Sequence, residues 1–155
     1  MNLLDFSSPK TQAEKEAEEA AKQAQEQPKP EREQAAYGDP DPVDPVKAEI
    51  AYDDFAAMDM RVCKVLKCQE IRKSHSCYKL TLSDGLDKRT IVSSIKAYYT
   101  PEELVGKKII VLANLKPTRI TGVTSEGMLL AATNNACGCK VIFVDDTVPE
   151  GTKIL

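Results

Sequence analysis

The chain has 155 residues, a formal net charge of −3, no tryptophan and five cysteines, which gives room for one domain with a tail. The N-terminal residues lack the basic start and apolar core of a secretory signal, and no apolar run reaches the roughly 18 residues that a membrane span needs. The five cysteines are odd in number and follow no disulfide-scaffold spacing, so we expect reduced thiols. Without a secretory signal or an apolar span, we expect a cytoplasmic location and no membrane contact.

Residues 1–49 are predicted to be a charged, proline-rich linker. Residues 11–27 are rich in Ala, Glu, Lys and Gln with almost no large apolar residue, so a helix there would be exposed. Two prolines stop such a helix, and residues 37–45 carry three Asp-Pro pairs, which favour extended or turn backbone. The pattern predicts a disordered or partly helical linker before a domain over residues 50–155.

The first part of this domain is predicted to contain a helical turn and then short strands. The helical turn can be capped by Asp53. Further on, the pattern alternates so that Tyr78, Leu80 and Leu82 share one face, and Asp84-Gly85 has the composition of a hairpin turn. The helical turn is predicted over residues 52–58, and the strands over residues 61–68, 77–82 and 89–95.

A short helix separates these strands from a later set. Thr100 can cap this helix, with Pro101 in the first helical position and Glu103 completing a capping box. Gly106 ends it. Later strands are predicted over residues 108–113, 127–132 and 139–144. Short strands, a central helix and Gly/Pro turns favour an all-β OB-fold, which is a five-stranded Greek-key barrel, here with a C-terminal extension.

The most informative stretch runs from Asn114 to Ala132. An apolar run ends in Asn114, a basic polar turn follows, and Ser125-Glu-Gly127 precedes a second apolar run. This pattern predicts two strands joined by a positively charged loop. Residues 60–120 hold 13 Lys and Arg against 5 Asp and Glu, whereas residues 1–49 hold 6 against 12. The asymmetry favours contact with nucleic acid, because clustered cations neutralise phosphates.

Five motifs carry a family resemblance. They are Asp53-Asp-Phe…Asp59-Met-Arg-Val62, Arg89-Thr-Ile-Val-Ser-Ser-Ile95, Tyr99-Thr-Pro-Glu-Glu-Leu-Val-Gly-Lys107, Asn114-Leu-Lys-Pro117 and Ser125-Glu-Gly-Met-Leu-Leu-Ala131. In this order they resemble the tRNA-binding domain that occurs as a free-standing chaperone-like module, at the C-terminus of bacterial methionyl-tRNA synthetases and in eukaryotic synthetase cofactors. The resemblance implies an OB barrel over about residues 50–155 that binds tRNA mainly by shape, and it implies dimerisation as in many bacterial members.

The acidic tail resembles the linker that tethers this module to a methionyl-tRNA synthetase. The resemblance therefore implies the non-catalytic appendix of such an enzyme, since no His-x-Gly-His or Lys-Met-Ser-Lys-Ser motif accompanies it. The chain departs from the family at Ser74–Leu80, where an Asp-Lys pair is usual. It also departs at Cys63 and Ser94, where the family favours glycine.

The candidate RNA contacts include strand lysines and the basic stretch. Lys116 and Arg119 would meet phosphates. Asn114 and Ser125 would donate hydrogen bonds to phosphate or ribose, or would only satisfy loop backbone. Met128 would pack against a base or sugar, or belong to the core. The resemblance also implies backbone contacts for Lys64, Lys79 and Lys96, which would otherwise lie on a solvated strand face. The candidates are thus Lys64, Lys79, Lys96, Asn114, Lys116, Arg119, Ser125 and Met128.

No cofactor, metal or catalytic site is expected. Cys137-Gly-Cys139 and the lone His75 lack the paired Cys-x-x-Cys pattern of structural zinc sites and any nucleophile–base arrangement. Aromatic residues are only 5% of the chain, which favours shape and phosphate recognition over base stacking. The expected partners are tRNA, a tethered synthetase catalytic domain and a second copy of the chain. The alternatives are a free-standing tRNA chaperone and a protein-interaction or dimerisation module using residues 141–144 and 154–155.

Overall fold

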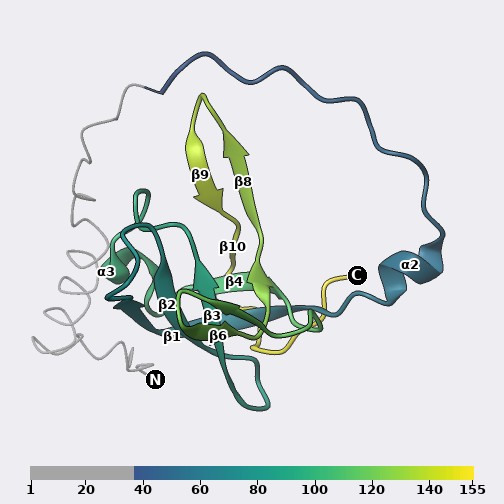
Figure 1. Cartoon of the computed structure of the whole chain (residues 1–155). Helices are drawn as coiled ribbons and strands as arrows, with labels where there is room; N and C mark the ends of the chain where they lie inside the picture. The colour runs from purple at the N-terminus through teal and green to yellow at the C-terminus, as the bar shows by residue number, and fades with distance from the viewer. Residues whose placement is uncertain (1–36) are drawn as a thin grey trace, which may run out of the picture. The chain divides into compact units, whose positions relative to one another are not determined.

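Residues 37–155 are described by the computed structural model, and the helix predicted within residues 11–27 lies outside this range. The described part is mostly β-structure, with two short helices (Figure 1). The helices are α2 (Tyr52–Ala56) and α3 (Pro101–Leu104). The strands are β1 (Met60–Glu70), β2 (Tyr78–Ser83), β3 (Lys88–Ser93), β4 (Lys108–Leu112), β5 (Thr118–Ile120), β6 (Val123–Ser125), β7 (Met128–Leu129), β8 (Ala131–Asn134), β9 (Gly138–Val141) and β10 (Phe143–Val144).

The main sheet has the order β10-β4-β1-β2-β3, with every neighbouring pair antiparallel and β7 also paired to β4. Its inner face is apolar because alternate residues of each strand point inward. Among them, Leu80, Leu82, Ile91 and Val111 are fully buried. With α3 between β3 and β4, this arrangement confirms the predicted all-β, OB-like barrel.

The barrel is closed between β3 and β4 by the Ser125-Glu-Gly127 step. The Glu126 N–H donates to the Thr90 carbonyl at 2.8 Å, and the Thr90 N–H donates to Glu126 Oε2 at 3.0 Å. Gly127 has a φ of +151°, and a Cβ there would lie 2.8 Å from the Leu112 carbonyl oxygen. Only glycine allows this close approach, so the motif has a structural role in joining β6 to β7.

A second, smaller core lies on the outer face of the main sheet. Ile71, Cys77 and Val92 are buried there, and Ile120 and Val123 pack against them. Ile120 is the last residue of β5, and Val123 is the first residue of β6. This satellite core therefore fixes the basic hairpin against the β1–β2 loop and β3.

Three local predictions need correction. Asp53 does not cap α2: Ala51 is the N-cap residue, and its N–H donates to Asp54 Oδ2 at 3.2 Å. The strand predicted over 127–132 is interrupted at Leu130, and the strand predicted over 139–144 is interrupted at Ile142. The chain leaves the main sheet for the β8–β9 hairpin at Leu130 and returns to it at Ile142. A hydrogen bond from the Ile142 N–H to the Leu130 carbonyl joins these two positions.

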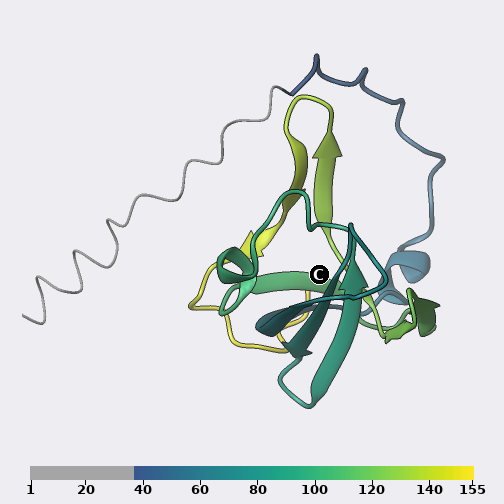
Figure 2. The ribbon, with the colours of Figure 1, turned by 60° about the vertical axis from the view of Figure 1, so that its left-hand side comes forward.

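The β8–β9 hairpin projects from the barrel (Figures 1 and 2). At its base, the Val141 N–H donates to the Tyr99 hydroxyl at 2.9 Å, and the Tyr99 ring packs edge-on against Phe143. Near its tip, the Asn135 N–H donates to Asp41 Oδ2 at 2.9 Å. The last part of the predicted linker thus contacts this hairpin.

The β5–β6 turn contains a strained residue. Thr121 and Gly122 form the turn with φ values of +50° and +84°. Two-residue hairpin turns favour positive φ, which costs a residue with a side chain roughly 1–2 kcal/mol but is tolerated by asparagine. We expect Thr121→Asn to raise the free energy of unfolding by about 1 kcal/mol, as measured in urea. An unchanged or lower free energy would contradict the strain.

Candidate nucleic-acid interface

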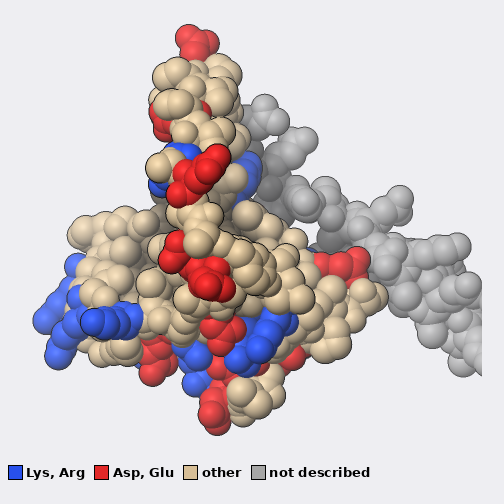
Figure 3. Space-filling model, turned by 90° about the vertical axis from the view of Figure 1, so that its right-hand side faces the viewer, with Lys and Arg blue, Asp and Glu red and all other residues tan. Residues whose placement is uncertain are grey.

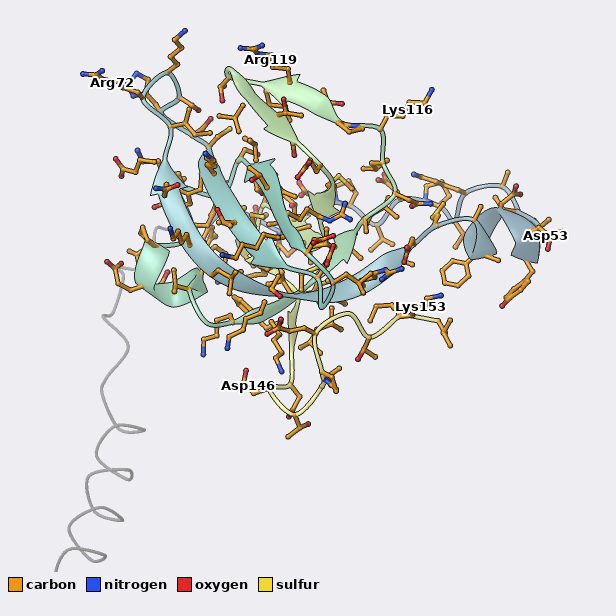
Figure 4. The ribbon with its side chains drawn as sticks, turned by 90° about the horizontal axis from the view of Figure 1, so that it is seen from below. Asp53, Arg72, Lys116, Arg119, Asp146 and Lys153 are labelled. Carbon is orange, nitrogen blue, oxygen red and sulfur yellow. The ribbon has the colours of Figure 1, made fainter. Side chains whose placement is uncertain are left out.

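Four exposed cations are spread along one side of the domain. Arg72 and Lys73 are in the β1–β2 loop, Lys116 is in the β4–β5 loop, and Arg119 is on β5. Figure 4 shows Arg72, Arg119 and Lys116 along one side of the domain, whereas Asp146 projects from the opposite side and Lys153 lies between them, beyond β1 in this view. The satellite core under the hairpin holds β5, which carries Arg119, against the β1–β2 loop, which carries Arg72 and Lys73. We call these four residues the basic edge.

The basic edge is free to bind anions. Within residues 37–155, none of its four side chains forms an ion pair; the pairs there are Arg61–Asp59, Arg89–Asp84 and Lys96–Glu70. Figure 3 shows Lys and Arg gathered at the left side of the domain, while acidic and basic side chains mix over its middle. Cations that no carboxylate neutralises within the domain are the groups that phosphates attract.

The predicted strand lysines have different surroundings. Lys79 pairs with Val92 across β2 and β3, so both side chains lie on the outer face that the hairpin partly covers. Lys64 lies on the same face of β1, but it pairs with Ser83 and Lys108 towards the other end of the strand. Lys96 is partly neutralised, with its Nζ 3.3 Å from Glu70 Oε1. The basic edge therefore extends over the outer face chiefly through Lys79.

Asn114 and Ser125 are engaged by the backbone. The Asn114 amide donates to the Ala57 carbonyl at 2.6 Å and accepts from the Asp59 N–H at 2.9 Å. The Ser125 hydroxyl is buried, donates to the Gly127 carbonyl and accepts from the Val92 N–H. These bonds match the alternative in which both residues satisfy loop backbone. Their contact with RNA stays a prediction.

Met128 lies at a cavity outside the core, and its 51% exposure rules out the core alternative. The cavity has a volume of about 540 Å³ and lies between the end of β3, the β4–β5 loop and the β7–β8 segment. Lys116 of the basic edge also lines it, as do Ser93 and Ser94. The structure thus brings Lys116 and Met128 to one cavity, with Arg119 on the adjoining strand.

Sequence reasoning missed Arg72 and Lys73. They contribute to the basic count of the region, but the sequence contains no motif that marks them. One signal was available, because two adjacent cations lie between two predicted strands and therefore in a connecting turn. What no local pattern could show is that the β5–β6 hairpin packs beside this turn.

Arg89, which begins one of the family motifs, joins three segments. Its Nη1 donates to the Ala113 and Glu126 carbonyls at 2.6 Å each, and its Nη2 donates to Asp84 Oδ2 at 3.2 Å. Asp84 is buried, and its carboxylate also accepts the N–H groups of Leu86 and Asp87. Burial alone would raise the pKa of Asp84, but these backbone bonds and Arg89 outweigh it and hold the pKa of this carboxyl below its ordinary value.

This depressed pKa predicts a pH dependence of stability. Because the folded pKa lies below the unfolded one, Asp84 stabilises the fold above pH 4, and this contribution is lost as the pH falls through the folded pKa. Asp84→Asn should therefore be less stable than the parent protein at pH 7, and the difference should shrink below pH 4. Urea unfolding at several pH values measures it. A difference that stays constant down to pH 2 would be inconsistent with this linkage.

Within residues 37–155, no helix is long and apolar enough to cross a membrane, and no three His, Cys, Asp or Glu side chains are grouped to hold a metal ion. All five cysteines are free thiols. Burial raises the pKa of the Cys63 and Cys68 thiols to about 11, so both are protonated at neutral pH.

An OB-like barrel with a cationic edge is typical of the barrels that bind oligonucleotides. Residues 60–153 match the sequence model of the family described as "Putative tRNA binding domain". The chain belongs to this family, and its matched part is a tRNA-binding module.

Known relatives agree with this assignment. The methionine–tRNA ligase of Bacteroides fragilis is 43% identical over 110 residues, which are 71% of this chain but only 16% of the ligase. The crystal structure of the MetRS related protein from Pyrococcus horikoshii matches with a TM-score of 0.67 and 36% identity, over 70% of this chain and 100% of that chain. The chaperone CsaA from Bacillus anthracis matches with a TM-score of 0.63 and 28% identity, over 70% and 100%.

Proposed function

We propose that the domain binds folded tRNA through its basic edge, with phosphates on Arg72, Lys73, Lys116 and Arg119. The observation that supports this most is that these four exposed cations lie on one edge without a carboxylate partner among residues 37–155. Phosphate contacts from a rigid barrel recognise the shape of a folded RNA. Lys79 adds a cation on the adjoining outer face.

We further propose that the module assists a methionyl-tRNA synthetase in cis, in the cytoplasm. The chain spans 16% of the length of the Bacteroides fragilis ligase, as an appended part would. A second binding site on a tether raises affinity because it acts at high effective concentration. Residues 37–50 are exposed, which suits a tether, and Asp41 in this segment is hydrogen-bonded to the tip of the β8–β9 hairpin. A free-standing tRNA chaperone is the alternative that the likeness to CsaA supports.

A salt series of gel shifts tests the proposed tRNA binding. The chain is titrated against a tRNA transcript and against duplex DNA with the same number of phosphates, from low to high salt. We expect tighter binding of the tRNA, with an affinity that falls steeply as salt rises. Equal, weak binding to both nucleic acids at every salt concentration would exclude the proposal.

A second candidate function is self-association through the β10 edge of the main sheet. Ile142 and Phe143 lie there with more than two fifths of their surface exposed, and an edge strand offers unpaired backbone groups. Light scattering separates monomer from dimer, and Ile142→Asp should weaken a dimer formed there. A monomer that binds tRNA well would remove dimerisation from the mechanism.

A further inference from the structure

The cavity beside the basic edge has a composition unlike that of the edge itself. Leu115 and Met128 contribute apolar surface, while Ser93 and Ser94 contribute hydroxyls. Neither hydroxyl forms a hydrogen bond within residues 37–155, whereas the neighbouring Ser125 hydroxyl is fully used. Two free hydroxyls beside apolar side chains suit a ligand that has an apolar body and a polar rim.

Lys116 connects this cavity to the basic edge. It lines the cavity and is itself an exposed cation of the edge. A ligand with one end in the cavity and a phosphate on Lys116 would therefore be a nucleotide. A volume of about 540 Å³ lies within the usual range of small-ligand cavities, roughly 300–1,000 Å³, and so admits one base with its ribose.

We propose that this cavity receives one unstacked nucleotide of the bound RNA, with its base against Met128 and Leu115 and its phosphate on Lys116. This inference rests on the proposed tRNA binding. A paired base has its faces stacked and its edge occupied, so only a nucleotide from a loop, bulge or end can enter. The thioether of Met128 suits the face of an aromatic base, and the hydroxyls of Ser93 and Ser94 suit its polar edge or the ribose 2′-OH.

The proposal changes how the RNA is recognised. The basic edge alone would bind any RNA of suitable shape, duplex included. A nucleotide cavity adds a preference for RNA that presents an unpaired base near its phosphates. Ser94 contributes directly to this preference, since the glycine that the family favours near this position would supply no hydroxyl.

The test fills the cavity from an exposed position. Ser94→Phe adds a bulky ring at the cavity, and Ala97→Phe adds the same ring at a nearby exposed residue that does not line it. Each variant is titrated by fluorescence anisotropy against a tRNA transcript and a fully paired, blunt RNA duplex with equal phosphates. We expect Ser94→Phe to lose about tenfold in tRNA affinity at unchanged duplex affinity, with a salt slope shallower by at most about 0.9, the contribution of one phosphate contact. Ala97→Phe should bind both RNAs like the parent.

The outcomes separate this inference from the proposed function. No loss on Ser94→Phe, or an equal loss for tRNA and duplex, would overturn the nucleotide site. A parent protein that does not bind the tRNA transcript would overturn both proposals. If Ser94→Phe fails to fold, as judged by its thermal transition, Met128→Ala provides the same test. Met128 is half-exposed, and its truncation should lower tRNA affinity but not duplex affinity.

Discussion

The double variant Lys116→Gln/Arg119→Gln should bind a tRNA transcript at least about tenfold more weakly than the parent protein at 0.1 M salt, by fluorescence anisotropy. Both side chains are exposed and have no carboxylate partner within residues 37–155, so their removal takes away phosphate contacts and frees no buried charge. The slope of log affinity against log salt should become shallower by about 1.5, because two phosphates are no longer neutralised.

A control variant separates the effect of removing cations at the basic edge from the effect of lowering the net charge. Lys107→Gln/Lys153→Gln removes the same formal charge from the turn after α3 and from the C-terminal segment, away from the basic edge (Figure 4). It should keep most of the tRNA affinity, because only long-range attraction is reduced. If the two double variants lose affinity equally, net charge and not the basic edge determines binding.

The substitution with the largest expected effect on stability is Arg89→Met. It leaves the buried Asp84 carboxylate without its cation and removes both hydrogen bonds to the carbonyls of Ala113 and Glu126. Breaking a buried ion pair costs roughly 3–5 kcal/mol. Because the Arg89 side chain is 24% exposed, we expect the lower end, about 3 kcal/mol in the free energy of unfolding. Urea or thermal unfolding measures it.

The chain offers a matched control for this prediction. Arg61 pairs with Asp59 at 2.9 Å and is as buried as Arg89, but its partner Asp59 is 32% exposed, whereas Asp84 is only 7% exposed. Exposed pairs contribute roughly 0–1 kcal/mol, so Arg61→Met should cost less than about 1 kcal/mol. Equal costs for Arg89→Met and Arg61→Met would show that the bonds from Arg89 across the barrel closure contribute little.

The secondary structure was predictable where the signals are local. Alternation marked Tyr78, Leu80 and Leu82 as one face, and all three are buried on β2. The Thr100-Pro-Glu-Glu103 start gave α3, in which the Thr100 N–H donates to Glu103 Oε2 at 2.8 Å. The interruptions at Leu130 and Ile142 could not be predicted, because an apolar run looks the same whether it continues in one sheet or crosses to another.

The candidate site was predictable only in part. The charge of Lys116 and Arg119 is visible in the sequence, as is the basic character of the region around them. The packing of the Arg119 hairpin beside the turn of Arg72 and Lys73 depends on the satellite core, whose members come from the β1–β2 loop, β3, β5 and β6. Sequence likewise cannot distinguish an exposed arginine from one that closes a barrel, so the role of Arg89 could not be predicted.

The salt dependence of tRNA binding tests the central claim most directly. The parent protein is compared with a variant in which Arg72, Lys73, Lys116 and Arg119 are all replaced by glutamine, and log affinity is plotted against log salt. If the basic edge binds tRNA phosphates, the line for the variant is shallower by about 3, from roughly 0.7–0.9 per phosphate contact. Parallel lines for the two proteins would contradict the claim that the basic edge binds tRNA.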